Sequence, residues 1–270
     1  MSIATTKFDA SKKTELKKFI KEQYDNFHPL LNDQLFDWMY KDSEIYLYID
    51  NNEIVGFNNY IKTQYQYYAN NELKLIDSIH FAMSKVLDKY NGLNIILEPH
   101  KEYNLICGMG FNRKTILPIL KQLKYTIIDP VPRVHMELTN LNKNNTNIFN
   151  IIDDVDCEKL ENIWIKSTSN NNIFGIYRNK NFWKWRYIDN PCFKNNEKYH
   201  FYGNYEIGII VFRKEKYINS NACRIVELIP YDHNVWNGVD NTDFNNLITE
   251  FTHWCYNNTI SIIDFYCTHK

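Results

Sequence analysis

Two similar stretches of sequence, about 150 residues apart, restrict the fold of this chain more than any other feature. Residues 35–56 and 182–208 both read as the end of an aromatic helix, a linker, a strand, a turn and a second strand. Three pairs of short motifs recur in one order, namely Trp38/Tyr40 with Trp185/Tyr187, Glu53-Ile54 with Glu206-Ile207, and Leu75-Ile76-Asp77 with Ile225-Val226-Glu227. Their nearly constant spacing favours duplication of one unit over chance similarity between two aromatic, amphipathic segments.

The first copy is predicted to open with helices and to continue as a meander of strands. Apolar residues at helical spacing predict helices over 14–26 and 33–41. Alternating apolar residues around Asn-Asn turns predict the strands that follow. These later elements are strands over 44–50, 53–68, 72–83 and 104–111, a helix over 113–124 and a final strand over 126–138.

The second copy repeats this order and ends sooner. Its expected elements are a strand over 148–152, helices over 156–167 and 179–188, strands near 198–203, 206–216 and 222–230, a helix over 242–257 and a strand over 260–267. Residues 140–147 lack apolar periodicity and are expected to be a linker. We therefore expect an α/β fold of two mixed-sheet units, over 1–143 and 148–270, the second short by a helix and a strand.

Composition restricts the partners and the compartment. Lys and Arg total 31 against 32 Asp and Glu, so no bulk charge attracts nucleic acid. No apolar run reaches the ~18 residues of a membrane-spanning helix, and the N-terminus shows no signal-peptide pattern. The closest two of the 6 cysteines, Cys255 and Cys267, are too far apart for a C-x-x-C motif. We expect a cytoplasmic protein with reduced thiols, no metal, no membrane span and no nucleic-acid partner.

The order of elements resembles the GNAT acyltransferase superfamily. The resemblance rests on the turn at 54–56 (Ile-Val-Gly) into a long strand and on the strand 108–111 (Gly-Met-Gly-Phe) before a helix. The string 182–191 (Phe-Trp-Lys-Trp-Arg-Tyr-Ile-Asp-Asn-Pro) resembles the start of a domain in tandem GNAT proteins of bacterial surface-glycan synthesis. The resemblance implies two GNAT-like units that transfer an acyl group from acetyl-CoA or another acyl thioester to an amine. The implied small-molecule acceptor is an amino sugar of polysaccharide biosynthesis.

In the GNAT family, the phosphates of CoA lie against free backbone N–H groups at a helix N-terminus. By resemblance, the cofactor-binding loop of the first unit consists of Asn91, Gly92, Leu93, Asn94 and Ile95. Asn91 stands where the family has a basic residue, and Asn94 where it has a second glycine. The loop of the second unit contains Gly238 and then Asp240, whose charge would repel phosphate. Both loops are therefore expected to bind CoA weakly.

Two strands carry side chains suited to acid–base catalysis. Glu227 lies on the predicted central strand of the second unit, and Tyr231 and His233 follow within six residues. A carboxylate, a phenol and an imidazole can accept and donate the protons of acyl transfer, although such groups also occur in ordinary strand-to-helix loops. In the first unit the candidates are Asp77 and His80, whose spacing places them on opposite faces of a strand. The alternative there is a hydrogen-bonded surface pair.

Two other functions stay open. A non-catalytic tandem GNAT-like module that binds a sugar or a carrier protein is favoured by the poor phosphate loops and opposed by the grouping of Glu227 with His233. An aminoacyl-tRNA-dependent ligase of the peptidoglycan-bridging type also duplicates this fold, but the chain lacks an obvious basic helical arm. The sequence also leaves a homodimer open.

Overall fold

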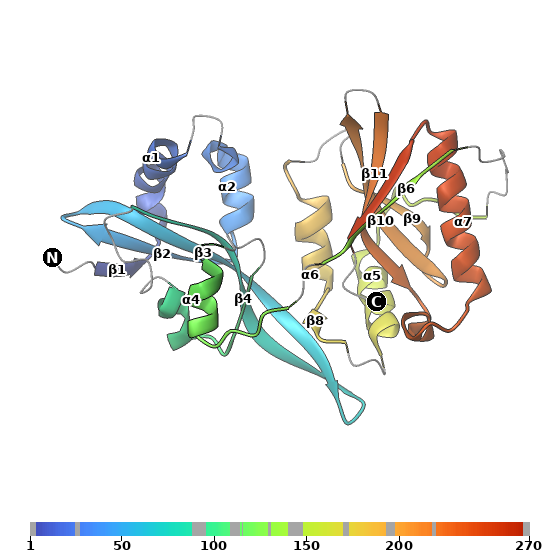
Figure 1. The fold of residues 1–270 in the computed structure, drawn as a ribbon, viewed down its shortest axis with the longest axis horizontal. Coiled ribbons are helices and arrows are strands. Elements are labelled where there is room, and N and C mark those ends of the chain that lie inside the picture. The colour runs from blue at the N-terminus through green and yellow to red at the C-terminus, as the bar shows by residue number, and fades with distance from the viewer. Residues whose placement is uncertain are drawn as a thin grey trace. The chain divides into compact units, whose positions relative to one another are not determined.

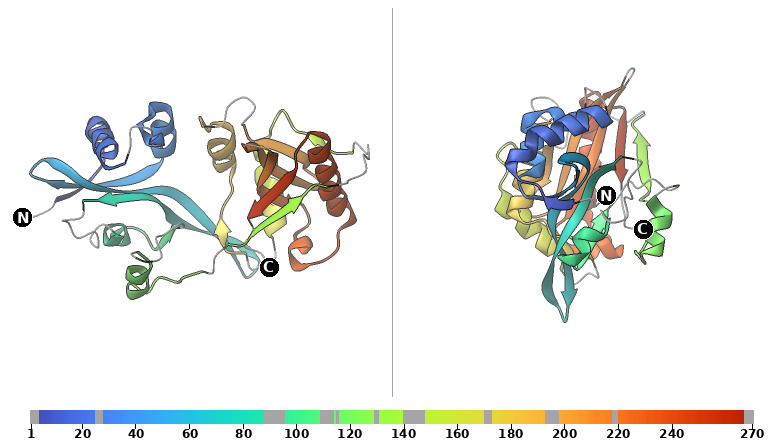
Figure 2. Two further views of the ribbon diagram at one scale, coloured as in Figure 1. Left: turned by 45° about the horizontal axis from the view of Figure 1, so that its top comes forward. Right: turned by 90° about the vertical axis from the view of Figure 1, so that its left-hand side faces the viewer.

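The computed structural model describes residues 4–24, 28–87, 96–108, 114, 116–128, 131–139, 148–169, 173–192, 198–217 and 220–266. Packing divides the chain into a first unit (Met1–Tyr67, Lys74–Ile127 and Phe174–Tyr177) and a second unit made of the remaining residues. Each unit has its own six-stranded mixed sheet with helices (Figures 1 and 2). The predicted α/β class with two mixed-sheet units is thus confirmed.

The first unit places α1 (Lys13–Gln23) and α2 (Asp33–Tyr40) on one side of its sheet and α4 (Ile116–Gln122) on the other (Figure 1). Its sheet has the order β1-β2-β3-β4-β5, and β8 pairs with the far end of β3. The strands are β1 (Ala4–Lys7), β2 (Ser43–Asp50), β3 (Glu53–Ala69), β4 (Glu72–Val86), β5 (Leu105–Gly108) and β8 (Gly175–Ile176). Short 3₁₀ helices are η1 (Ala10–Lys12), η2 (Pro29–Leu31) and η3 (Glu98–Lys101).

The long β2–β3–β4 meander follows from its turns. Asn51 and Asn52 both have positive φ, 50° and 65°, and Asn70 and Asn71 have 53° and 62°. Asn tolerates this left-handed conformation, and two such residues in succession form the tight turn whose twist matches antiparallel strands. The predicted strands over 44–50, 53–68 and 72–83 are confirmed.

Both faces of the first sheet are packed. On one face, Leu16, Phe19 and Ile20 of α1 and residues of α2 pack on the sheet residues Ile45, Leu47 and Phe57. We call this the α1/α2 face. The opposite face carries a cluster of Tyr46, Tyr48, Val55, Tyr60 and Ile79, which we call the tyrosine face. Along β2 the alternation of side chains separates the two clusters. In β3 a β-bulge at Val55 shifts the alternation, so Val55 and Phe57 belong to different clusters.

The second unit has α5 (Cys157–Thr168) and α6 (Lys180–Trp183) on one side of its sheet and α7 (Thr242–Asn257) on the other (Figure 1). The sheet has the order β6-β12-β11-β10-β9-β7. A π-helical turn, η4 (Lys184–Ile188), continues α6, and the 3₁₀ helix η6 (His233–Asn237) precedes α7. The strands are β6 (Arg133–Glu137), β7 (Asn150–Ile151), β9 (His200–Asn204), β10 (Gly208–Tyr217), β11 (Ser220–Pro230) and β12 (Ile262–Tyr266).

Helix α7 closes the main core of the second unit. Phe244, Leu247 and Phe251 of α7 pack on Phe212 of β10 and Ile225 of β11, all of them buried. The predicted helix over 242–257 is confirmed at both ends. Its N-terminus is capped by Asn241, whose side chain accepts a hydrogen bond from the backbone N–H of Phe244. Within the described ranges, no helix combines the length and the apolar character needed to cross a bilayer.

One predicted strand lies in the other sheet. The sequence placed residues 126–138 at the end of the first unit, but β6 pairs antiparallel with β12 of the second unit. Asp264 of β12 fixes this pairing, because it accepts hydrogen bonds from Nε and Nη2 of Arg133 at 2.9 and 2.8 Å. The strand that the second unit seemed to lack therefore comes from the chain that precedes it, and packing divides the chain after Ile127, ahead of the predicted linker at 140–147.

Candidate functional site

In the described part of each sheet, the pairing between strands changes where the parallel strand pair ends. Strand β4 pairs with β5 from Ser78 to Phe81, and β11 pairs with β12 from Ala222 to Ile225. In the described part of the chain, each of the two longer strands then continues for five residues beyond the pairing, to Val86 and to Pro230. Each of the two longer strands thus extends beyond its last described pair with its parallel neighbour.

A β-bulge at this point turns Glu227 away from the core under α7. Val211 of β10 pairs with Glu227 and Phe212 pairs with Ile225, so Val226 is the extra residue. Ile225 and Leu228 pack toward α7. Because of the extra residue, Glu227 faces the opposite side of the sheet, where α5 and α6 lie.

Strand β4 changes face at the matching point. Phe81 packs against the tyrosine face, whereas Met83 packs against the α1/α2 face, although residues two apart in a regular strand share one face. Met83 lies two residues after Phe81, the last residue of β4 in the parallel pair. Glu227 lies two residues after Ile225, the last such residue of β11, so the two positions match. The match of Asp77 with Glu227 in the sequence is therefore wrong in register, because Asp77 precedes the parallel segment and Glu227 follows it.

Glu227 is held by one buried partner, Tyr187, and one partly buried partner, Arg178. Its Oε1 accepts a hydrogen bond from the Tyr187 hydroxyl at 2.6 Å and one from Nε of Arg178 at 2.9 Å. The Arg178 guanidinium lies 4.0 Å from the centroid of the Trp164 ring. Burial raises the pKa of Tyr187 well above its usual value, so the phenol stays protonated and remains a donor. The carboxylate is thereby fixed in one orientation.

The other residues predicted for the second site lie in the loop after β11. Tyr231 is 39% exposed, and His233 begins η6. Asp232 caps η6 by accepting a hydrogen bond from the backbone N–H of Asn234, which lowers the pKa of this carboxyl group. Gly238 ends η6 with a φ of 77°. The hydrogen bonds that Glu227 accepts in the described structure come from Arg178 and Tyr187, so they do not join it to Tyr231 or His233.

In the first unit, the candidates lie on β4. Asp77 is exposed and accepts a hydrogen bond from Nε2 of Gln64 at 2.9 Å. His80 is half-buried next to the end of the parallel segment, and burial lowers the pKa of its imidazole, which is therefore neutral at neutral pH. Ala82, two residues further on, is exposed. The predicted loop residues Asn91, Gly92, Leu93, Asn94 and Ile95 lie outside the described residues.

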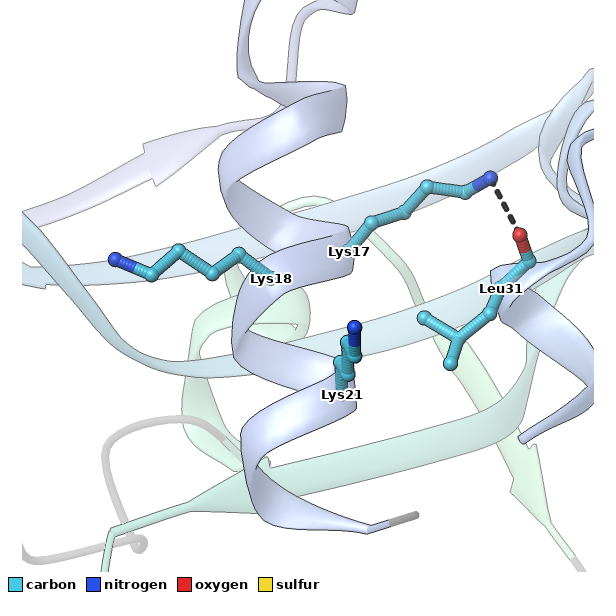
Figure 3. Close-up of a pocket in the computed structure, with 4 residues that line it drawn as sticks. All are labelled: Lys17, Lys18, Lys21 and Leu31. Carbon is cyan, nitrogen blue, oxygen red and sulfur yellow. Dashed lines mark hydrogen bonds between the residues drawn. The ribbon is translucent and has the colours of Figure 1, made fainter. Parts of the chain in front are cut away.

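A separate hollow of about 640 Å³ lies beside α1 (Figure 3). Its lining consists of Lys17, Lys18, Lys21 and Leu31. The Lys17 ammonium donates to the Leu31 carbonyl oxygen at 2.9 Å and pairs with Asp33 at 2.6 Å, while Lys18 points away from Leu31 (Figure 3). None of the residues predicted for catalysis lines this hollow.

Sequence reasoning missed Arg178 and did not give Tyr187 a role at the site. They precede Glu227 by 49 and 40 residues, in a different part of the unit. No motif links them to Glu227, because the contacts form only when η4, which carries Tyr187, and the segment before α6, which carries Arg178, pack near β11. The one signal in the sequence was the aromatic string 182–191, of which only Trp185 and Tyr187 have a match in the first copy.

No protein-family model and no curated protein matches this sequence. Solved structures do match its fold. A probable N-acyltransferase of unknown function from Enterococcus faecalis V583 aligns with a TM-score of 0.70 at 8% identity, over 98% of this chain and 65% of that chain. A GCN5-related N-acetyltransferase from Kribbella flavida gives 0.67 at 9% identity, over 99% and 64%. N-myristoyltransferase from Saccharomyces cerevisiae, with bound myristoyl-CoA and inhibitors, gives 0.51 at 10% identity, over 97% and 74%.

At such low identity, these matches concern the fold. The chain spans slightly less than two thirds of the length of the first two structures, while almost all of its own length takes part. Both units are included in these alignments. The chain has the fold of the GCN5-related N-acetyltransferases.

Proposed function

We propose that this protein transfers an acyl group from acyl-CoA to an amine. The observation that carries the proposal is that β4 extends to Val86, beyond its last described pair with β5 at Phe81. In our proposal, this end of β4 offers backbone N–H and C=O groups to the amides of a pantetheine arm. The shared fold supports the proposal, since the matched structures are described as N-acyltransferases and one of them contains myristoyl-CoA.

We place the donor in the first unit. Ala82 on the free end of β4 is exposed, whereas Glu227, Ile229 and Pro230 on the free end of β11 are buried. The acidic side chain of Asp240 beside α7 would also repel a pyrophosphate. The predicted loop from Asn91 to Ile95 follows β4 in the chain, and its role in binding phosphate stays a prediction.

In the proposed reaction, the amine attacks the thioester carbonyl, a C–N bond forms, and the C–S bond breaks to release the CoA thiol. The proton lost by the amine passes to a base near the end of the parallel segment. We propose His80 for this role because its imidazole is neutral and half-buried there. The set predicted in the second unit, Glu227 with Tyr231 and His233, remains a second hypothesis that the same assays test.

We further propose an amino sugar as the acceptor, which rests on the resemblance of residues 182–191 to tandem GNAT proteins of glycan synthesis. The specific alternative is a binding module without catalysis. The Arg178–Glu227–Tyr187 contacts favour that role for the second unit, because they fix the carboxylate as a structural partner.

The test combines acetyl-CoA binding by calorimetry with release of the CoA thiol in the presence of amino sugars. The blocking variant is Ala82→Trp, and its matched control is Leu75→Trp, an exposed position on β4 ahead of the parallel segment. We expect binding and turnover in the wild type and the control and their loss in Ala82→Trp. If the wild type binds an amino sugar but no CoA, the protein is a binding module, and the proposed transferase activity is wrong.

A further inference from the structure

In the part of the chain that the structure describes, strand β6 forms an exposed edge of the second sheet. All five of its residues, from Arg133 to Glu137, are exposed. Two of them are apolar and lie on the α7 side of the sheet, Val134 at 56% and Met136 at 44% exposure. An open edge with apolar side chains can pair with a strand of another chain, and folded proteins commonly protect such edges.

The backbone of β6 has hydrogen-bonding groups that point to its free side. The Leu138 N–H, in register with Ser261, donates to the Ser261 carbonyl oxygen at 2.8 Å. Successive residues of an antiparallel strand direct their N–H and C=O groups alternately to one side and the other. The groups of Val134 and Met136 therefore point toward β12, and those of Arg133, His135 and Glu137 point outward.

We propose that β6 pairs antiparallel with the β6 of a second copy of this chain, with the two-fold axis at His135. In this register, His135 lies opposite its own counterpart, and Arg133 lies opposite Glu137 of the second copy. All three outward residues then exchange backbone hydrogen bonds across the interface. Val134 lies beside Met136 of the second copy in the closer, non-hydrogen-bonded pair.

Charge and polarity single out this register. The sequence Arg-Val-His-Met-Glu is complementary to itself when reversed, because a cation meets an anion at both ends and apolar residues meet between them. A shift by two residues in either direction would break both Arg–Glu pairs. A two-fold interface requires this kind of self-complementarity. The guanidinium of Arg133 is also held in place by Asp264 on its own chain.

The β1 edge of the first sheet lacks these features. The Phe8 N–H donates to the Ile45 carbonyl oxygen at 2.9 Å, so Thr5 and Lys7 of β1 point outward. Neither residue offers an anion to a lysine from a second copy, and a lysine on an edge strand opposes pairing. The Lys7 ammonium is held by Glu102 at 2.6 Å and Glu44 at 3.3 Å. Strand β1 therefore serves as a matched control.

Five paired residues bury less than the roughly 1,600 Å² of a standard interface, so the dimer should be weak and should form at high protein concentration. The test is sedimentation velocity over a concentration series with wild type, His135→Pro and Thr5→Pro. Proline at 135 removes an outward N–H and leaves the pairing with β12 intact. We expect His135→Pro to raise the dimer dissociation constant about tenfold or more and Thr5→Pro to leave it unchanged.

A charge exchange tests the register without relying on proline. Glu137→Arg alone should weaken the dimer, and so should Arg133→Glu alone. A mixture of the two variants should form a heterodimer, because each Arg again meets a Glu. Thermal unfolding of each variant checks that it is folded. The proposal is overturned if the wild type stays monomeric at every concentration, if folded His135→Pro dimerises as tightly as the wild type, or if the mixture gains no affinity over the single variants.

Discussion

The two units differ most where their sheets are most alike. At the end of the parallel strand pair, the second unit places Glu227, fixed by Arg178 and Tyr187, whereas the first unit places Met83, packed on the α1/α2 face. Ile229 and Pro230 at the end of β11 are buried, and Ala82 of β4 is exposed. The difference shows how one topology can either close its strand end with a buried ion pair or leave it accessible, which is why we assign the donor to the first unit.

The largest effect should come from removing the cation beside Glu227. Arg178→Ala leaves the carboxylate buried beside Tyr187 without its ion-pair partner, which should lower the free energy of unfolding by about 3 kcal/mol. Urea denaturation measures this change. Lys180→Ala is the control, because Lys180 pairs with Glu158 on the surface and should contribute nothing measurable. Equal stability of Arg178→Ala and wild type would show that Glu227 is not held by this pair.

The catalytic assignment predicts a kinetic difference between the units. His80→Gln should lower kcat by roughly 100-fold with little change in acetyl-CoA affinity, whereas Glu227→Gln should keep most of the turnover. Asp77→Asn is the matched control on the same strand. If Glu227→Gln loses turnover and His80→Gln does not, the active unit is the second one.

The pH dependence of kcat tests the assignment of His80 as the base. Burial lowers the pKa of His80 below its ordinary value of 6.5, so the neutral base persists to a lower pH and the acid limb of kcat should have its midpoint below 6.5. The unfolded chain binds this proton more readily than the native one. The contribution of His80 to stability is therefore complete above 6.5 and is lost as the pH falls through the lower native pKa. In acid denaturation curves, the free energy of unfolding of His80→Gln should therefore fall less steeply over this pH range than that of the wild type.

Exchanging the matched side chains tests whether their surroundings differ as described. Met83→Glu would bury a carboxylate against the α1/α2 face, where no Arg178 equivalent is seen among the described residues, and should cost about 2 kcal/mol. Ala82→Glu, one residue earlier at an exposed position, should cost much less. Urea denaturation measures the free energy of unfolding of both variants. An equal loss in the two would mean that the side chains of β4 do not change face between Phe81 and Met83.

The smallest effect concerns the turns that build the first sheet. Asn52→Gly should raise the free energy of unfolding by about 0.5 kcal/mol, because glycine adopts the positive φ of 65° without strain. Asn52→Ala should instead lower it, and thermal unfolding can compare the two. A stabilising Asn52→Ala would contradict the left-handed turn.

The sequence predicted those elements whose signal is local. Helix α7 has its cap and its apolar stripe within its own residues, and the β2–β3 hairpin has its turn residues between its strands, so both were found at nearly the right bounds. The partner of β6 was missed because strand pairing depends on a distant edge, here β12. The sequence placed Glu227 on a strand, where the structure has it, but its contacts with Arg178 and Tyr187 depend on packing between distant elements. The match between Asp77 and Glu227 failed because Asp77 precedes its parallel strand pair and Glu227 follows its own, and pairing with a distant strand leaves no local trace in the sequence.

Hydrogen–deuterium exchange with and without acetyl-CoA tests the central claim most directly, since it reports on both strand ends in one experiment. We predict that acetyl-CoA slows exchange of the amides that end β4, residues 82–86, and leaves those near the end of β11, residues 226–229, unchanged. Protection confined to 226–229, or no protection in either strand at saturating acetyl-CoA, would contradict the account.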